Sequence, residues 1–600
     1  MGDETNLTMD DPSVITIHNI STRMPSHDPK NASKPTDHLY ALVDMGSNGI
    51  RFSISDLSPP TSRLLPCIYR DRAAISLYDA LHSSHTGARA SFFDADTMAR
   101  VSAHLAAFKR TCDSYGVPKG NIAVFATEAM RTARNADAMR GAVRRESGLS
   151  VDLLSPQVES LLGAVGARSG FAGVRGLMMD LGGGSVQMSF MDSGGVGGGG
   201  GVGVRARGEE GGGETYWEKS AASAKSMPFG AAKMTAALKE GDIDNIRIDM
   251  RSSFHETFQG LCESFPTLQD LVENEGVTIY LCGGGFRGYG SMLMHTDPIT
   301  PYPIPSIAGY KVSGTRFPQT RALLQVNREE KGKIHGMSKR RREQFPAIVE
   351  VIEAITATVP KIKEVIFCGG GNREGVLFLK LPPATQETPP LLLFPSACHT
   401  RNETEIKALV QILSSALPPD QAAPKLLFPE DILTYVAQHM WENMADISNL
   451  NAARALHAPI SGPLAGMPGL THDVVAILSL TMCARWENDL GKVDRGVREG
   501  LGRILGADAA WWCEYVGLVV RLVCVLFPVC PKEGLGGKLW FEGEWRWGLG
   551  KKGGKEGVLL RVLRGAAERR GGDVDLDLGE VVGKVGKGLG LKRRVEVSWG

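Results

Sequence analysis

The sequence predicts an α/β fold made of two similar lobes, followed by a mainly helical C-terminal region. Three observations support this prediction. Runs typical of strands alternate with runs typical of helices from Leu39 to about residue 385. The segments LVDMGSNGIRFSIS and MMDLGGGSVQMSFM repeat one pattern of apolar strand, Asp, glycine-rich turn and apolar strand. Residues from 401 to about 530 are mostly typical of helices.

A chain of 600 residues is too long to fold around one hydrophobic core, so several domains are expected. Residues 1–37 are polar, Pro-containing and aperiodic, which predicts a disordered leader. The first lobe is expected over 38–173 and the second over 174–385, with a flexible glycine-rich insertion at 194–213. The Pro-rich segment LPPATQETPPLLLFP marks the boundary to a C-terminal region over 386–600.

The first lobe is expected to begin with a pair of strands and to continue with alternating helices and strands. Its strands are predicted at 39–45, 50–57, 121–127 and 151–154, and its helices at 98–116, within 128–148 and from Pro156. The second lobe begins with strands at 176–182 and 185–191, and two strand-to-glycine junctions follow, VTIYLCGGG and EVIFCGGG. This alternation is the sequence basis for the α/β class.

The charge balance and the cysteines limit the expected partners and cellular location of the protein. Lys plus Arg number 67 and Asp plus Glu number 66, which gives no electrostatic reason to expect a nucleic-acid or membrane-surface protein. Ten scattered cysteines favour a reducing compartment, and the polar N-terminus lacks the features of a secretory signal, so a cytoplasmic location is expected. The apolar run at 511–530 is interrupted by Glu514 and Arg521, which favours a buried helix over a membrane span.

The repeated pattern predicts two β-hairpins with special turns. We expect positive φ angles at Asn48 and Gly49 in the first turn and at Gly182, Gly183 and Gly184 in the second. Successive backbone amides in such turns can converge on an anion.

The aspartate that precedes each turn predicts that a metal ion binds together with the anion. Asp44 and Asp180 are placed to hold Mg²⁺ against the phosphate oxygens that the turns bind. Each motif alone is equally well explained as an ordinary hairpin with a good turn. The repetition is what favours phosphate binding.

Four motifs occur in a fixed order: LYALVDMGSNGIRFSISDL, ATEAMRTARN, SPQVES and MDLGGGSVQM. Together they resemble the exopolyphosphatase and guanosine pentaphosphate phosphohydrolase (Ppx/GppA) family over roughly residues 38–385. The resemblance implies two ribonuclease-H-like lobes of the actin-like ATPase superfamily around a cleft. It also implies Mg²⁺ as cofactor and polyphosphate or a nucleotide, either ATP or a guanosine polyphosphate, as ligand. The first motif and the long C-terminal region are most similar to a fungal branch that signals from mitochondria to the nucleus, which implies a regulatory protein partner.

The resemblance also implies residue roles. Arg51 and Arg131 match arginines that contact phosphate. Glu159, in a helical first turn with Ser155 as N-cap and Pro156 as first residue, matches the general base, although an acidic residue is also favourable at any helix start. The predicted site comprises catalytic Glu159, Arg51 and Arg131, phosphate-binding Gly46, Ser47, Asn48, Gly49, Gly182, Gly183, Gly184 and Ser185, and metal-binding Asp44 and Asp180.

Two positions depart from the family pattern. Gln187 stands where an acidic residue is typical, and Leu161 stands where an Arg is typical. An amide cannot neutralise Mg²⁺ as a carboxylate can, so binding is expected to tolerate these changes better than turnover does.

Three further motifs have low specificity. The two CGGG junctions fall where superfamily members approach the ligand, or reflect tight strand–helix packing. The basic run 339–342 could contact a polyanion, but a solvated helix end is the favoured interpretation. Thr471-His472-Asp473 is interpreted as the capped start of a core helix rather than a metal site.

Three functions compete on the sequence alone. The first is a phosphohydrolase of the exopolyphosphatase class. The second is a nucleotide-binding signalling protein with vestigial catalysis. The third and weakest is a small-molecule kinase, against which the Glu159 motif argues.

Overall fold

The computed structural model describes residues 13–82, 91–194, 216–241, 243–394, 403–444, 448–531, 533–550, 552–565, 585–586 and 588–600. The chain divides into two compact units. The first unit comprises Met1–Thr296 and Ile307–Thr388, and the second comprises Asp297–Ser306 and Pro389–Gly600. The glycine-rich insertion predicted at 194–213 lies outside the described residues, except for Gly194.

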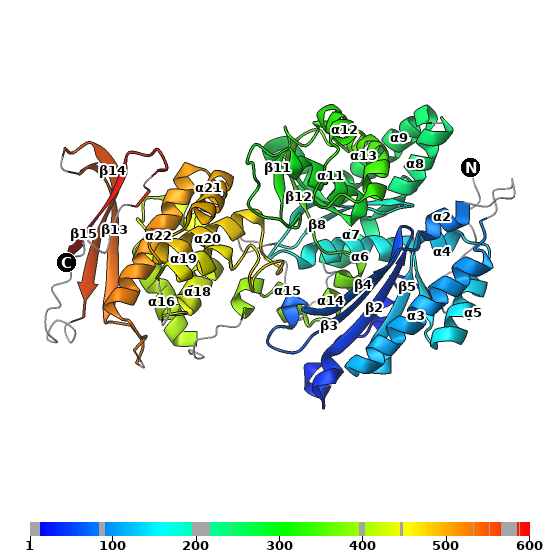
Figure 1. Cartoon of the computed structure of the whole chain (residues 1–600), viewed down its shortest axis with the longest axis horizontal. Helices are drawn as coiled ribbons and strands as arrows, with labels where there is room; N and C mark the ends of the chain where they lie inside the picture. The colour runs from blue at the N-terminus through cyan, green and yellow to red at the C-terminus, as the bar shows by residue number, and fades with distance from the viewer. Residues whose placement is uncertain are drawn as a thin grey trace. The chain divides into compact units, whose positions relative to one another are not determined.

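The first unit contains two six-stranded sheets (Figure 1). The strands of the first sheet, in the order β1-β6-β5-β2-β3-β4, are β1 (Val14–Ile15), β2 (Leu39–Gly46), β3 (Gly49–Asp56), β4 (Cys67–Ala73), β5 (Ile122–Ala126) and β6 (Val151–Leu154). Strands β2, β3 and β4 pair antiparallel, whereas β2, β5, β6 and β1 pair parallel.

The second sheet repeats this arrangement. Its strands, in the order β11-β12-β10-β7-β8-β9, are β7 (Arg175–Leu181), β8 (Val186–Asp192), β9 (Lys225–Met227), β10 (Val277–Cys282), β11 (Lys311–Ser313) and β12 (Ile362–Phe367). Strands β7, β8 and β9 pair antiparallel, and β7, β10 and β12 pair parallel. Five strands of each sheet therefore share one order and direction, which confirms the predicted duplicated α/β fold.

Helices cover both faces of the first sheet. The helices of the first unit are α1 (Ile20–Arg23), α2 (Leu77–His82), α3 (Ala95–Tyr115), α4 (Glu128–Thr132), α5 (Ala136–Ser147), α6 (Pro156–Ser169), α7 (Tyr216–Ser223), α8 (Ala231–Glu240), α9 (Ile243–Ser264), α10 (Pro266–Asp270), α11 (Gly283–His295), α12 (Thr320–Glu329), α13 (Lys339–Thr358), α14 (Asn372–Lys380) and α15 (Pro383–Glu387). Alternate residues of β2 face opposite sides: Ala41 and Val43 pack with α3 and α5, whereas Tyr40 and Leu42 pack with α6.

Glycines bring the elements that carry α6 and α14 into backbone contact. A Cβ on Gly166 of α6 would lie 2.1 Å from the carbonyl oxygen of Gly371, and one on Gly375 of α14 would lie 2.1 Å from that of Leu162. These two helices each follow the last parallel strand of their sheet. In the second CGGG junction itself, a Cβ on Gly370 would lie 1.9 Å from the carbonyl oxygen of Gly166, so tight packing, one of the two interpretations that the sequence left open, explains this glycine.

The leader prediction is wrong for residues 13–37. Val14 and Ile15 are buried and extend the first sheet as β1, paired with β6, so order begins well before Leu39. The amide of His27 donates to the carbonyl oxygen of Lys380 at 2.7 Å, and the Lys380 ammonium donates to that of Pro25 at 3.0 Å. Because these contacts come from residues far apart in sequence, no local periodicity announces them.

We expect Lys380→Met to change how stability depends on pH. Burial lowers the pKa of Lys380 to about 8, whereas an unfolded Lys titrates near ~10.4. The buried ammonium therefore costs stability below its folded pKa, and this cost is relieved as the pH rises from 8 towards the unfolded value. Urea denaturation should show wild type gaining about 2 kcal/mol relative to Lys380→Met between about pH 7 and pH 9.5. The exposed Lys239→Met is the control, and an equal gain there would contradict the assignment.

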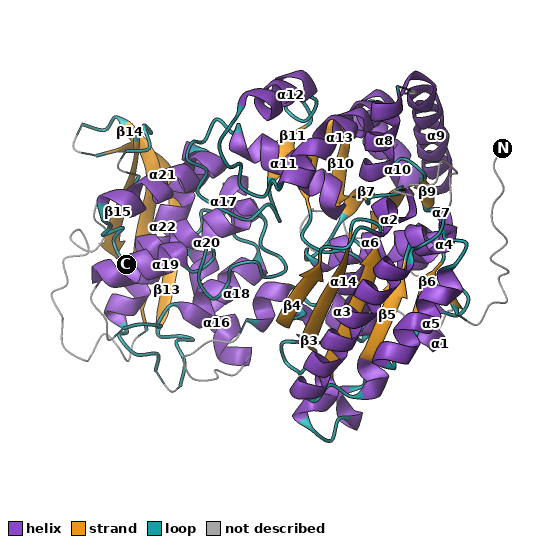
Figure 2. Ribbon diagram, turned by 45° about the vertical axis from the view of Figure 1, so that its right-hand side comes forward, coloured by secondary structure: helices purple, strands orange, loops and turns teal. Residues whose placement is uncertain are grey.

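The second unit is helical up to Leu526 and ends in a three-stranded sheet (Figure 2). Its elements are α16 (Glu403–Ser415), α17 (Ala422–Leu427), α18 (Glu430–His439), α19 (Ser448–His457), α20 (His472–Arg485), α21 (Lys492–Leu505), α22 (Ala507–Leu526), β13 (Leu539–Leu549), β14 (Lys555–Arg564) and β15 (Arg593–Trp599). Within the described residues, α22 alone is long and apolar enough to cross a membrane. Most of it is buried in this unit's core, including Trp511, Trp512 and Tyr515, which agrees with the predicted buried helix.

Candidate functional site

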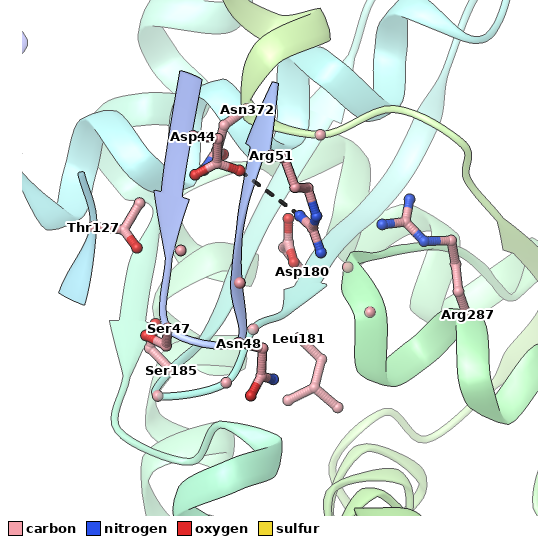
Figure 3. A pocket seen from close by; sticks show the side chains of 18 of the residues that line it. Asp44, Ser47, Asn48, Arg51, Thr127, Asp180, Leu181, Ser185, Arg287 and Asn372 are labelled. Atoms are coloured by element: carbon pink, nitrogen blue, oxygen red, sulfur yellow. Dashed lines mark ion pairs between the residues drawn. The ribbon is translucent and has the colours of Figure 1, made fainter. Parts of the chain in front are cut away.

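One pocket of the first unit is lined by residues from both sheets (Figure 3). Its volume is about 120 Å³. The lining includes Asp44, Gly46, Ser47, Asn48, Gly49, Arg51, Glu159, Asp180, Gly182, Gly183, Gly184 and Ser185, which are all the predicted site residues except Arg131. Asp44 and Asp180 thus face a common cavity.

The two hairpins hold their turns in the same way. Asp44 pairs with Arg51 across the first hairpin, and Asp180 pairs with Gln187 across the second, so Gln187 occupies the position equivalent to Arg51. The carbonyl oxygen of Ser47, three residues after Asp44, accepts from an amide in the first turn of α2. The carbonyl oxygen of Gly183, three residues after Asp180, accepts from amides in the first turn of α8. The duplication therefore extends to the helix that supports each turn.

This support orients the amides of the second turn. The carbonyl oxygens of Gly182, Gly183 and Gly184 accept from Ala231, Ala232 and Gly230. Because a planar trans peptide points its N–H opposite to its C=O, the amides of Gly183, Gly184 and Ser185 point away from α8. Neither Gly183 nor Gly184 uses its amide in a hydrogen bond to another described residue. These amides are available to an anion in the pocket.

The predicted positive φ angles hold for Gly49 alone, at +155°, and not for Asn48, Gly182, Gly183 or Gly184. In the second turn, Cβ atoms on two of the glycines would instead displace side chains of the first lobe. A Cβ on Gly183 would lie 2.8 Å from the Asn48 side chain, and one on Gly184 would lie 1.8 Å from the Glu128 carboxylate. The close approach of the two lobes therefore limits the side chains that fit at Gly183 and Gly184. A prediction made from one hairpin alone cannot include this contact.

Asp44 is a buried carboxylate with an unsatisfied oxygen, and Asp180 is a half-buried one. Asp44 is 5% exposed, its Oδ1 has no hydrogen-bond partner among the residues that the structure describes, and its Oδ2 lies 3.7 Å from Nη1 of Arg51. Burial raises the pKa of Asp44, against the opposing effect of Arg51 and Arg373. Burial likewise raises the pKa of Asp180, against Arg287. An orphaned buried carboxylate oxygen is a position that a cation would satisfy.

Glu159 is fixed by its helix and by Arg131. As predicted, Ser155 caps α6 by accepting from the amide of Val158, and Glu159 lies in the first turn. Nη2 of Arg131 donates to Oε2 of Glu159 at 2.8 Å, while its Nη1 donates to the carbonyl oxygen of Leu154 at 2.6 Å. Burial raises the pKa of Glu159 and Arg131 opposes this shift. Arg131 does not line the pocket, so its place is that of a positioning residue behind Glu159.

Four arginines that the predicted site did not include also line the pocket. Besides Arg51, the lining contains Arg72, Arg287, Arg340 and Arg341. Burial and the charges of Arg287, Arg51 and Arg72 lower the pKa of Arg341 to about 10. Several of these guanidiniums use backbone carbonyl oxygens as partners: Arg72 donates to Asn48, Arg287 to Gly369 and Arg341 to Gly336. These three arginines form no ion pair with a carboxylate of the described residues, so their charge favours a polyanionic ligand.

The interpretation of the run 339–342 as a solvated helix end is wrong for its second residue, Arg340, as well as for Arg341. Arg340 donates to Asn48 Oδ1 at 2.9 Å and to Ser76 Oγ at 2.8 Å, and pairs with Asp79 at 2.9 Å. It therefore links α13 of the second lobe to the first lobe. A basic run on a helix end gives no sign of such distant partners.

The two departures from the family pattern occupy different environments. Gln187 lines the pocket and donates to Ser185 Oγ at 2.7 Å and to Ser226 Oγ at 3.1 Å. Leu161 lies on α6 itself, is 1% exposed and belongs to a hydrophobic core. The first change alters the pocket, and the second removes a charge from the helix that carries Glu159.

The pocket residues are suited to a Mg²⁺ ion that is coordinated by both the protein and a phosphate. In the described parts of the chain no three His, Cys, Asp or Glu side chains come close enough to enclose a metal ion. Mg²⁺ typically takes one or two carboxylates and completes its shell with water and substrate phosphates. Asp44, with its orphaned oxygen, and Asp180 match this requirement.

Duplicated α/β lobes whose aspartate-led turns meet at one pocket define a protein with the actin-like ATPase fold. The model of the Ppx/GppA phosphatase family matches residues 57–384, which is more than half of the chain, so the chain belongs to the Ppx/GppA phosphatase family. A second model, the RTG2 C-terminal domain, matches residues 391–597.

The chain is similar to retrograde regulation protein 2 from Saccharomyces cerevisiae, with 28% identity over 505 residues, 82% of this chain and 81% of that protein. Among solved structures, an exopolyphosphatase from Cytophaga hutchinsonii is 19% identical over 57% of this chain and 96% of its own, with a TM-score of 0.41. The Aquifex aeolicus PPX-GPPA enzyme is 20% identical over 56% and 98%, with a TM-score of 0.40.

Proposed function

We propose that this protein is a phosphohydrolase of the Ppx/GppA type, which binds polyphosphate or a nucleotide, ATP or a guanosine polyphosphate, with Mg²⁺ between its lobes. The observation that carries the proposal is the single pocket in which Asp44 and Asp180 face two glycine-rich turns and a group of arginines. Carboxylates beside phosphate require a cation, and the arginines supply further positive charge to the chain of phosphates. Retrograde signalling in the cytoplasm is the proposed setting, supported by the similarity to retrograde regulation protein 2.

In the proposed reaction, the amides of Gly183, Gly184 and Ser185 and the guanidinium of Arg51 bind the terminal phosphoryl group. Mg²⁺ held by Asp44 and Asp180 would neutralise charge on the phosphate oxygens. Glu159 accepts a proton from a water molecule whose oxygen forms a bond to phosphorus. The anhydride P–O bond breaks, and the rest of the ligand leaves as a phosphate anion.

The expected result is Mg²⁺-dependent release of inorganic phosphate from polyphosphate, guanosine pentaphosphate or ATP, measured colorimetrically and matched by calorimetric binding of the same ligands. Asp180→Ala should weaken Mg²⁺-dependent binding by at least about 10-fold, because loss of a metal ligand should cost no less than loss of a residue that only orients one. Asp192→Ala is the matched control, since Asp192 pairs with Arg175 and does not line the pocket. Wild type that neither binds nor hydrolyses any of these ligands would contradict the proposal.

A catalytically weak nucleotide-binding signalling protein is the second candidate. Gln187 favours it, because an amide tied to Ser185 and Ser226 stands in the pocket where the family typically has an acid. Binding that is lost in Asp180→Ala, without phosphate release by wild type, would select this candidate over the first.

A further inference from the structure

Helix α11 joins the pocket directly to the second unit through the chain. Its first residues, Gly283 and Gly284, and Arg287 line the pocket. The helix ends at His295, and the next residues, Asp297–Ser306, belong to the second unit before the chain returns to the first at Ile307. We call Asp297–Ser306 the strap.

The strap is held inside the second unit by a buried histidine. His472, the first residue of α20, is 2% exposed. Its Nε2 lies 2.9 Å from the carbonyl oxygen of Ser306, and its Nδ1 lies 2.7 Å from the Tyr302 hydroxyl. Because a carbonyl oxygen only accepts, Nε2 carries the proton and Nδ1 accepts from Tyr302. Ile304 of the strap belongs to the core of the second unit. The strap therefore moves with that unit.

Helix α6 makes a second connection of the same kind. Glu159 lies in its first turn, and Arg168 lies near its end with a fully buried side chain. Nη2 of Arg168 donates to Oε2 of Glu387 at 2.8 Å. The guanidinium of Arg63, also fully buried, donates to the carbonyl oxygen of Gln386 at 2.9 Å. The chain enters the second unit again at Pro389, so α6 holds the chain two residues before its last passage between the units.

We infer that α6 and α11 transmit the occupancy of the pocket to the second unit. Both helices carry pocket-lining residues at their N-terminal ends. At its C-terminal end, α11 leads into a passage of the chain from the first unit to the second, and α6 contacts the chain just before another such passage. A short helix is stiff, so a ligand that fixes the first end restricts the second. This inference rests on the proposed function for the ligand and adds its regulatory consequence: a bound polyphosphate orders the strap and its anchor on α20.

The test is hydrogen–deuterium exchange of the full chain with and without inorganic tripolyphosphate and Mg²⁺, alongside calorimetric titration. The expected result is slower exchange in the two turns and also in the strap and at the start of α20. Protection confined to the first unit, with binding confirmed by calorimetry, would overturn the coupling and leave the proposed function standing. Absence of tripolyphosphate binding would overturn both.

Variants of His472 and Tyr302, which anchor the strap, distinguish the coupling between the pocket and the strap from ligand binding itself. His472→Ala should abolish the ligand-dependent protection of the strap and, by thermodynamic reciprocity, change tripolyphosphate affinity by about 5-fold. Tyr302→Phe tests the same anchor by removing one hydroxyl without opening a cavity. The matched control is His457→Ala, because His457 pairs with Asp494 in the same unit and does not touch the strap. Unchanged strap protection in both anchor variants would overturn the role of His472.

Discussion

Glu159→Gln is expected to lower the rate of phosphate release by about 10²–10⁴-fold, the usual contribution of general base catalysis. The amide keeps the shape of the carboxylate but cannot accept a proton from water. Since Asp44, Asp180 and the turns are untouched, tripolyphosphate binding should persist in calorimetry. Equal rates for wild type and Glu159→Gln would remove Glu159 as the base.

Arg131 gives this prediction a second readout. A general base works only when ionised, so the rate should rise with pH through the pKa of Glu159. Burial raises that pKa and Arg131 holds it down. Arg131→Ala should therefore move the acid limb of the pH–rate profile to higher pH. Arg134→Ala is the matched control, because Arg134 contacts the Phe92 ring rather than the pocket. An unshifted profile in Arg131→Ala would contradict its positioning role.

The features that local sequence could predict are those whose causes are local. A strand, an aspartate and a glycine-rich turn specify a hairpin, and Ser155, Pro156 and Glu159 specify the start of a helix, so the structure confirms these elements where they were predicted. The shared pocket of Asp44 and Asp180 followed from noticing that one hairpin repeats the other.

The features that were missed depend on partners distant in sequence. Arg340 resembles a solvated residue until Asn48, Ser76 and Asp79 of the other lobe are placed beside it. Gly184 has no positive φ angle, and its nearness to the Glu128 carboxylate of the first lobe is not visible in the local sequence. The role of α8 in orienting the second turn also depends on residues beyond the glycine-rich insertion.

Gly166→Ala is the other substitution with a large expected effect. Its Cβ would lie 2.1 Å from the carbonyl oxygen of Gly371 and within 2.8 Å of that residue's backbone nitrogen, so no side-chain rotation relieves the overlap. Either α6 moves away from the chain before α14 or the fold loses stability, by about 3 kcal/mol at the upper end of common overpacking costs. Because α6 carries Glu159, even a tolerated shift should reduce phosphate release.

A Gly→Ala change at an uncrowded helical position should instead stabilise the fold, and this contrast makes the test specific to the contact at Gly166. Gly260 lies in α9 with nothing within 4 Å of the position a Cβ would take. Gly260→Ala should therefore raise the free energy of unfolding by about 0.5–1 kcal/mol, as Ala is the better helix former. Chemical denaturation of both variants measures the contrast. If Gly166→Ala proved as stable as Gly260→Ala, the backbone contact between Gly166 and Gly371 would not exist in solution.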